Sequence, residues 1–148
     1  MHSVKIMSVL TGKWQFERSF NHSGSATGTA IFSPREDFLF YRETGVLHLH
    51  QHFNFYREYI FSVNKDSIAV WFVNNYKKGK FFYNLKISSY DGITCEMRGA
   101  HQCMNDHYVA TYKIFSEDSF EMRYVIAGPK KDYFIDTKYR AVEQVAYE

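Results

Sequence analysis

The sequence alternates between apolar and polar residues in short segments, and a turn-forming cluster separates most segments from the next. In the first segment, Trp14, Phe16, Arg18 and Phe20 occupy every second position, with polar residues between them. This period of two is typical of a strand with one buried face. About ten such segments follow one another with a turn roughly every 8–12 residues, and this spacing predicts an all-β sandwich or barrel.

Composition and connectivity favour the barrel. Aromatic residues make up 19% of the chain, with 14 Phe and 12 Tyr against only 2 Pro, and this balance suits strands. Consecutive antiparallel strands close naturally as an up-and-down barrel, which leaves no exposed edge to aggregate. We therefore predict a single antiparallel up-and-down β-barrel domain of about ten strands over residues 1–148, with residues 1–10 as a lid or a strand extension.

Net charge, cysteine usage and hydropathy indicate where in the cell this protein is expected and which partners it is expected to bind. The net charge is +2 with His neutral, so no global electrostatic attraction to nucleic acid or membranes is expected. No apolar run is long enough to span a bilayer. Cys95 and Cys103 form no CxxC pair, and no signal peptide is visible. We therefore expect reduced thiols in a cytoplasmic protein that is a monomer or a homodimer.

Two pairs of polar residues share strand faces with large apolar ones. Tyr41 and Glu43 lie on one such face, and Arg57 and Tyr59 lie on another. A buried charge costs several kcal/mol unless it is paired and hydrogen-bonded. Three interpretations stay open: an internal Arg57–Glu43 ion pair, charges that face outward, or groups that anchor a ligand.

The stretch Gly45–Phe53 contains His48, His50 and His52 at every second position. Two histidines at this spacing on one strand can converge on a metal ion. However, on a single strand His52 would lie about 13 Å from His48, so the three cannot bind one ion. We predict that the intervening leucines face the core and that the histidines face outward, with no metal site.

The stretch His101–Tyr108 contains several side chains that can transfer protons. His101 and Cys103 share a strand face, as do Asp106 and Tyr108 beyond a predicted turn. Such a cluster can be a hydrogen-bonded structural feature at one end of the barrel, or it can perform acid–base or thiolate chemistry. Both interpretations stay open.

A second predicted turn follows at Gly128–Asp132. Gly128 and Pro129 end a strand, and Asp132 can cap the turn. Lys130 and Lys131 between them could receive an anionic group, or they could simply belong to a solvated hairpin.

Two short motifs resemble those of known barrel proteins. Gly12-Lys13-Trp14 resembles the Gly-x-Trp start of calycins, the group that includes lipocalins, fatty-acid-binding proteins and nitrobindins. That resemblance implies an arginine of the last strand over the Trp, and Arg140 lies at the corresponding position. Arg57-x-Tyr59 resembles the pair that holds a ligand carboxylate in fatty-acid-binding proteins, although there the pair lies on a later strand.

Nearly the whole chain is similar to an uncharacterised family of about 150 residues, close to the 148 found here. The family motifs are an early Trp, Tyr-x-Glu-x-Gly, Arg-x-Tyr, Phe-His-x-Leu, His-x-Cys-x-x-Asp-x-Tyr and Gly-Pro-Arg/Lys-Lys-Asp-Tyr. They fall here on Trp14, Tyr41–Gly45, Arg57–Tyr59, Phe82–Leu85, His101–Tyr108 and Gly128–Tyr133. The chain departs from the family at Tyr83, which replaces the histidine of the fourth motif. The resemblance implies no established activity.

These observations predict a barrel that binds a small, largely apolar ligand with a polar or anionic end, without a cofactor. The predicted ligand contacts are Tyr41, Glu43, Arg57, Tyr59, His101, Asp106, Tyr108, Lys131 and Arg140. One alternative is a small-molecule enzyme, an isomerase, cyclase or hydrolase, that uses His101, Asp106 and Tyr108. Others are a haem- or metal-binding barrel, with His101 or the histidine triplet as ligands, and an interaction module whose barrel is filled.

Overall fold

The computed structural model describes residues 3–21 and 24–142, which form one helix and ten strands. The helix is α1 (Ser3–Leu10). The strands are β1 (Gly12–Phe20), β2 (Ser25–Pro34), β3 (Leu39–His48), β4 (His52–Asn64), β5 (Ser67–Asn74), β6 (Lys77–Tyr90), β7 (Cys95–Cys103), β8 (Asp106–Ser116), β9 (Ser119–Ala127) and β10 (Asp132–Ala141).

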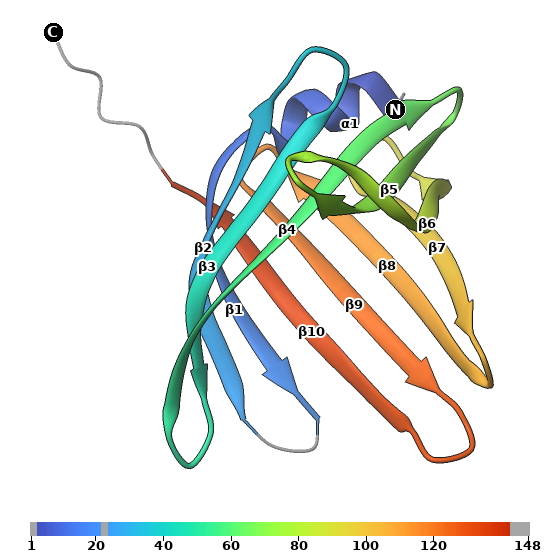
Figure 1. Ribbon diagram of the computed structural model, residues 1–148. Coiled ribbons are helices and arrows are strands. Elements are labelled where there is room, and N and C mark those ends of the chain that lie inside the picture. The colour runs from blue at the N-terminus through green and yellow to red at the C-terminus, as the bar shows by residue number, and fades with distance from the viewer. Residues whose placement is uncertain (1–2, 22–23, 143–148) are drawn as a thin grey trace, which may run out of the picture.

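The ten strands form a closed barrel in which each strand pairs with its neighbour in the sequence (Figure 1). The barrel closes between β1 and β10, which pair antiparallel from Trp14 opposite Ala141 to Phe20 opposite Ile135. Closure gives every strand of the barrel two hydrogen-bonded neighbours, so the described sheet has no free edge. The prediction of an all-β, antiparallel up-and-down barrel is confirmed.

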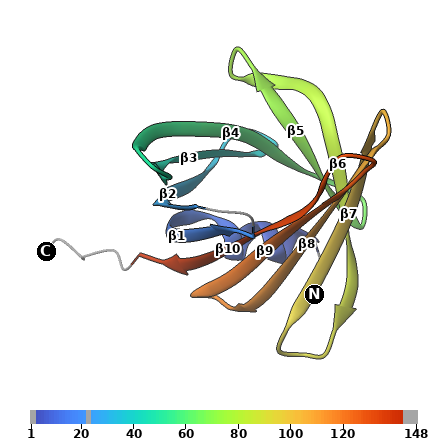
Figure 2. The ribbon, with the colours of Figure 1, turned by 90° about the horizontal axis from the view of Figure 1, so that it is seen from below.

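Helix α1 lies across one end of the barrel (Figure 1). Ile6 and Leu10 are fully buried, and the carbonyl of Leu10 accepts a 2.8 Å hydrogen bond from the indole Nε1 of Trp14. The segment for which the sequence predicted a lid or a strand extension is therefore a helix that closes this end. We call the opposite end, where the β1–β2, β3–β4, β7–β8 and β9–β10 hairpins turn, the barrel mouth; Figure 2 views the barrel from that side.

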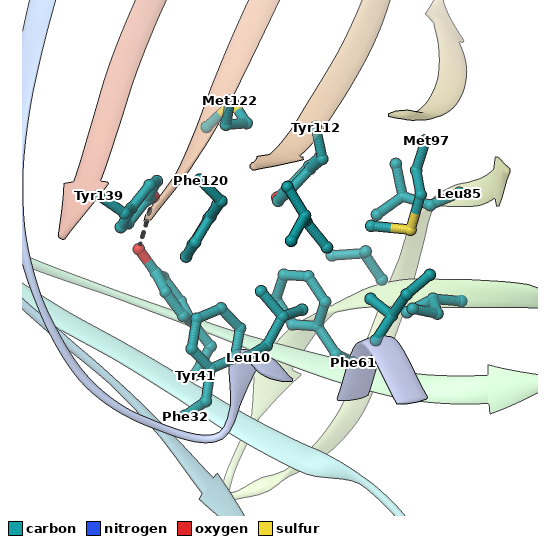
Figure 3. Packing of buried hydrophobic residues seen from close by; sticks show 14 of the residues in the cluster. Leu10, Phe32, Tyr41, Phe61, Leu85, Met97, Tyr112, Phe120, Met122 and Tyr139 are labelled. Carbon is teal, nitrogen blue, oxygen red and sulfur yellow. Dashed lines mark hydrogen bonds between the residues drawn. The ribbon is translucent and has the colours of Figure 1, made fainter. Parts of the chain in front are cut away.

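The core is densest beneath α1, where aromatic rings from several strands meet. Trp14 packs edge-to-face on Phe120 at 4.7 Å between ring centroids, and Phe32 packs in the same way on Phe61 at 5.3 Å. Figure 3 shows Leu10 of α1 in this cluster. These side chains belong to the inward-facing positions of their strands, so the end of the barrel next to α1 is filled by the protein itself.

The stretch Gly45–Phe53, which contains the histidine triplet, does not form a single strand. β3 runs on to His48, and the turn lies at 49–51. Gly45 lies within β3 opposite Gly28 of β2, where a Cβ on Gly45 would approach the carbonyl oxygen of Thr27 to 2.5 Å. This glycine therefore permits a close approach of two strands instead of making a turn.

The turn at 49–51 also changes the geometry of the histidine triplet. His48 and His52 face each other across the hairpin with ring centroids 4.8 Å apart, so the separation of about 13 Å expected on one strand is wrong. His48 is half-buried with Nε2 3.1 Å from the hydroxyl of Thr27, and His50 and His52 are exposed. Within residues 3–21 and 24–142, no three His, Cys, Asp or Glu side chains are grouped closely enough to hold a metal ion.

The β5–β6 hairpin departs from the regular wall of the barrel. Its register is irregular around Trp71, and at its tip Tyr76 stacks on Phe40 at 6.4 Å between ring centroids. Phe40 alternates with the inward-facing Leu39 and Tyr41, so this contact covers the outer face of β3. In the described part of the chain, no helix has the length and the apolar character needed to cross a bilayer.

Candidate functional site

A buried ion pair lies midway along the barrel, on its inner face. Arg18 of β1 donates from Nη1 and Nη2 to the two carboxylate oxygens of Glu43 of β3, at 2.7 and 2.9 Å. Its Nε donates to the hydroxyl of Thr137 of β10 at 2.8 Å. The side chains of Arg18 and Glu43 are only 4% and 2% exposed. Such a two-bond arrangement is the strongest geometry available to an arginine and a carboxylate.

Both members of this pair remain ionised because each compensates for the burial of the other. Burial favours the neutral form of Arg18, but the hydrogen bonds to Glu43 and the electrostatic interactions with Tyr139, Glu43 and Tyr41 together outweigh it and raise the pKa of Arg18. Burial likewise raises the pKa of Glu43, and the hydrogen bonds and charge of Arg18 reverse this effect, so that the pKa of Glu43 lies below its usual range. The pair therefore carries one positive and one negative charge at neutral pH.

Tyrosine hydroxyl groups extend this network through the barrel interior. Tyr41 donates to Glu43 at 2.5 Å, and its oxygen lies 3.0 Å from the hydroxyl of Tyr139 (Figure 3). Tyr83 and Tyr112 form a second pair with their hydroxyl oxygens 3.1 Å apart. Burial raises the pKa of each of these tyrosines, so their hydroxyl groups keep their protons. Tyr83 thus replaces the histidine of the family motif with a buried hydrogen-bonding group.

The interior cavity between these side chains is small. It measures about 30 Å³ and is lined by the Arg18–Glu43 pair and by the tyrosines of both pairs. A cavity of this size holds about two water molecules. The middle of the barrel therefore has no room for an organic ligand.

A larger pocket opens at the barrel mouth, and we call it the mouth pocket. It measures about 400 Å³ and is lined by Arg18, Phe20, Ala26, Leu47, Leu49, Phe55, Tyr56, Arg57 and Tyr133. β2 contributes only a methyl group at Ala26 and no side chain at Gly28, where an added Cβ would meet the ring of Phe16 at 2.8 Å. Space is therefore available beside Ala26, where the inward side chain of β2 is small, whereas Phe16 fills the space at Gly28.

Arg57 lies at the boundary between the mouth pocket and the small interior cavity and lines both. Its side chain is exposed, and its charge contributes to the lowered pKa of Glu43. The Arg57–Glu43 ion pair, one of the three interpretations left open by the sequence, is nevertheless absent, because Arg18 occupies both carboxylate oxygens. Among the residues that the structure describes, Arg57 has no carboxylate within ion-pair distance.

A second polar cluster lies on the rim of the mouth, between the β7–β8 and β9–β10 hairpins. Lys131 Nζ lies 3.2 Å from a carboxylate oxygen of Asp106 and 3.4 Å from the hydroxyl of Tyr108. The rings of Tyr108 and His101 are 6.0 Å apart. The hydrogen bonds to Asp106 and Tyr108 raise the pKa of Lys131, which therefore stays protonated. This geometry favours the structural interpretation of the cluster over proton transfer.

Gly128 explains part of the sequence motif on this rim. A Cβ at this position would collide with the carboxylate of Asp106, so glycine lets the β9–β10 turn approach Asp106 without displacing its carboxylate. The Gly-Pro-Lys-Lys-Asp and His-x-Cys-x-x-Asp motifs thus meet in one place, at the ion pair between Lys131 and Asp106.

The predicted site residues therefore divide into three groups. Tyr41, Glu43, Arg57 and Tyr59 meet beneath the mouth pocket, and His101, Asp106, Tyr108 and Lys131 meet on the rim. Arg140 belongs to neither group. Because Thr137 and Tyr139 occupy the inward positions of β10, Arg140 is exposed on the outer face. The expectation that Arg140 lies over Trp14 is therefore wrong.

Sequence reasoning left out four residues of the interior network: Arg18, Tyr83, Tyr112 and Tyr139. The signal for Arg18 was present, because it shares the strand face of Trp14 and Phe16 and is the charged member of that face. The tyrosines gave no comparable signal, since Tyr is common throughout this chain and its alternation alone does not separate a packing role from a polar one.

Fold and site together define a closed ten-stranded barrel with a buried arginine–carboxylate pair and a pocket at one end. The chain belongs to a family of unknown function, DUF6314, whose model matches residues 10–141. This match confirms the family resemblance seen in the sequence. None of the curated proteins compared with this chain matches it.

Solved structures with a similar fold include natural and designed barrels. The S-type phycobiliprotein lyase CPES from Guillardia theta is similar with a TM-score of 0.63 at 7% identity, over 98% of this chain and 95% of that chain. The redesigned β-barrel mFAP1, bound to DFHBI, has a TM-score of 0.45 at 12% identity, over 90% of this chain and 96% of that chain. The likeness to the lyase is one of fold.

Proposed function

We propose that this protein binds a small, largely apolar ligand with an anionic end in the mouth pocket. The observation that carries the proposal is Arg57, a guanidinium with no carboxylate partner among the described residues, beside apolar walls. A volume of about 400 Å³ lies within the range of small-molecule sites, which combine apolar walls with few polar groups. Phe20, Leu47 and Phe55 supply apolar surface from three different strands.

The charges beside the pocket support an anionic ligand group. Arg18 and Glu43 neutralise each other, so Arg57 leaves one uncompensated positive charge at the base of the pocket. Arg57 is exposed at the mouth, so an anionic group can reach its guanidinium from solvent. An anion next to Arg57 would gain a charge-assisted hydrogen bond.

Substitution of Arg57 tests the proposal. Binding of an anionic fluorescent probe, anilinonaphthalene sulfonate, is titrated for the wild type, Arg57→Gln and the control Arg98→Gln. Arg98 lies on the outer face of β7 with its side chain 60% exposed. A hydrogen bond to a charged group contributes about 1.5–3 kcal/mol, so Arg57→Gln should weaken binding at least about tenfold.

The control should bind the probe as the wild type does, and the melting temperatures of all three proteins should be compared to verify that each is folded. Equal affinities of the wild type and Arg57→Gln, with both folded, would remove Arg57 from the site and with it the main support for an anionic ligand.

A further inference from the structure

We infer that the mouth pocket selects a compact aromatic monocarboxylate and discriminates against long-chain fatty acids. This inference rests on the proposed function and specifies the class of ligand. Three features of the pocket carry it: its depth, the chemistry of its walls, and the number of cations that are available to a ligand.

The depth of the pocket is limited by the polar network beneath it. Arg18 forms part of the pocket wall and is only 5% exposed, held by Glu43 and Thr137. Beyond it, the interior leaves about 30 Å³ between tyrosine side chains. An acyl chain could pass this point only by breaking the buried ion pair, which costs several kcal/mol. A ligand must therefore end above Arg18.

The pocket is also limited sideways, because aromatic side chains fill the opposite side of the barrel interior. Phe82 of β6 stacks on Phe72 of β5 with ring centroids 4.4 Å apart, and packs edge-to-face on His101 of β7 at 5.5 Å. Tyr59 extends the same cluster, at 6.1 Å from Phe82. The free volume is therefore confined to the side formed by β1 to β4 and Tyr133 of β10.

The walls that remain are rich in aromatic rings. Three of the nine lining residues are aromatic and occupy inward-facing positions of their strands: Phe20, Phe55 and Tyr133. Tyr56 also borders the pocket, but its ring lies under the guanidinium of Arg42 on the outer face of β4. Aromatic pairs in offset or edge-to-face contact are stabilised beyond the burial of their surface. A flat ring system gains this additional stabilisation against such walls. A flexible alkyl chain is stabilised only by the burial of its apolar surface, and it loses rotational freedom on binding.

The polar contacts favour a single carboxylate. Each of the three guanidinium nitrogens of Arg18 already donates a hydrogen bond, to Glu43 or to Thr137. Arg57 is thus the guanidinium in the pocket wall that a ligand can neutralise, and it carries one charge. A second carboxylate on the ligand would meet aromatic walls and would not be compensated there.

Displacement of bound anilinonaphthalene sulfonate from the full chain tests the inference with three competitors. Naphthoate is a compact aromatic acid, naphthamide is its neutral analogue, and palmitate, used below its micelle concentration, is a long-chain acid. We expect naphthoate to bind at least tenfold more tightly than both naphthamide and palmitate. In Arg57→Gln, the difference between naphthoate and naphthamide should disappear.

A pocket-filling variant locates the binding. Leu47 lines the mouth pocket and is half-buried, so Leu47→Trp should occupy the space with little strain in the core. It should reduce naphthoate binding at least tenfold while the melting temperature stays close to that of the wild type. Unchanged binding in a folded Leu47→Trp protein would overturn the assignment to this pocket.

The outcomes separate the inference from the proposed function. Palmitate binding as tightly as naphthoate, or more tightly, would overturn the choice of ligand class and leave an apolar anion as the ligand. Equal binding of naphthoate and naphthamide by the wild type would overturn the role of the carboxylate. No binding of the sulfonate probe or of any competitor would overturn the proposed function itself.

Discussion

Replacing Glu43 with glutamine isolates the contribution of the buried ion pair. The substitution keeps the size and shape of the side chain but leaves the guanidinium of Arg18 charged, 5% exposed and without a counter-charge. Breaking a buried pair by removing one partner costs about 3–5 kcal/mol. Domains of this kind have free energies of unfolding of about 5–15 kcal/mol, so this loss is a large fraction of the total.

Urea unfolding followed by tryptophan fluorescence measures this cost, with unchanged m-values as evidence that the transition stays two-state. Glu58→Gln is the matched control, because Glu58 of β4 pairs with Arg42, the residue before Glu43 in β3, on the exposed outer face of the barrel. Removing that surface pair should cost only about 0–1 kcal/mol. The double variant Arg18→Met/Glu43→Gln should be less destabilised than Glu43→Gln alone, since no charge is then left unpaired.

A cost of less than about 1 kcal/mol for Glu43→Gln, equal to that of the Glu58→Gln control, would refute the reasoning. It would mean that Arg18 finds water or another partner as soon as Glu43 is neutralised. In that case the network is not rigid, and the floor of the mouth pocket could open to a longer ligand.

Two further predictions concern acid stability and the packing of β2 against β3. The pKa of Glu43 is lowered in the folded state, so its stabilising contribution is complete above the ordinary pKa of glutamate and is lost as the pH falls through the lowered value. Urea midpoints measured below about pH 5 should therefore fall more steeply for the wild type than for Glu43→Gln, and parallel curves would contradict this. Gly28→Ala should cost about 1–3 kcal/mol in the same assay, because its Cβ would collide with the carbonyl oxygen of Thr44 and crowd Phe16. The control Thr29→Ala, at the next position of β2, should cost less; equal costs would show that the two strands can separate.

The sequence alone predicted the barrel and most inward-facing positions for a local reason. Side chains alternate across a strand, so Tyr41 and Glu43 could be placed on one face, and Arg57 and Tyr59 on another, without knowing what lies opposite them. Short turns between consecutive segments then made neighbouring strands antiparallel, and ten such strands close on themselves. These features depend on residues within a few positions of one another.

Local patterns also misled in two places. The histidine triplet was considered on a single strand, but in the structure a turn forms at 49–51 without glycine or proline. α1 was not predicted as a helix, because eight residues are too few to show a helical period or to be stable alone. The burial of Ile6 and Leu10 against the barrel end stabilises this helix, and that surface exists only once the strands have closed.

Tertiary structure alone decided which charges compensate each other and how deep the pocket is. Arg18 lies 25 residues from Glu43 and Thr137 lies 119 residues from Arg18, yet all three meet inside the barrel. Alternation assigns a side chain to a face, but its partner depends on strand register and on closure between β1 and β10. For the same reason, Arg57 is left available to a ligand only because Arg18 of β1 reaches over β2 to the carboxylate of Glu43 of β3.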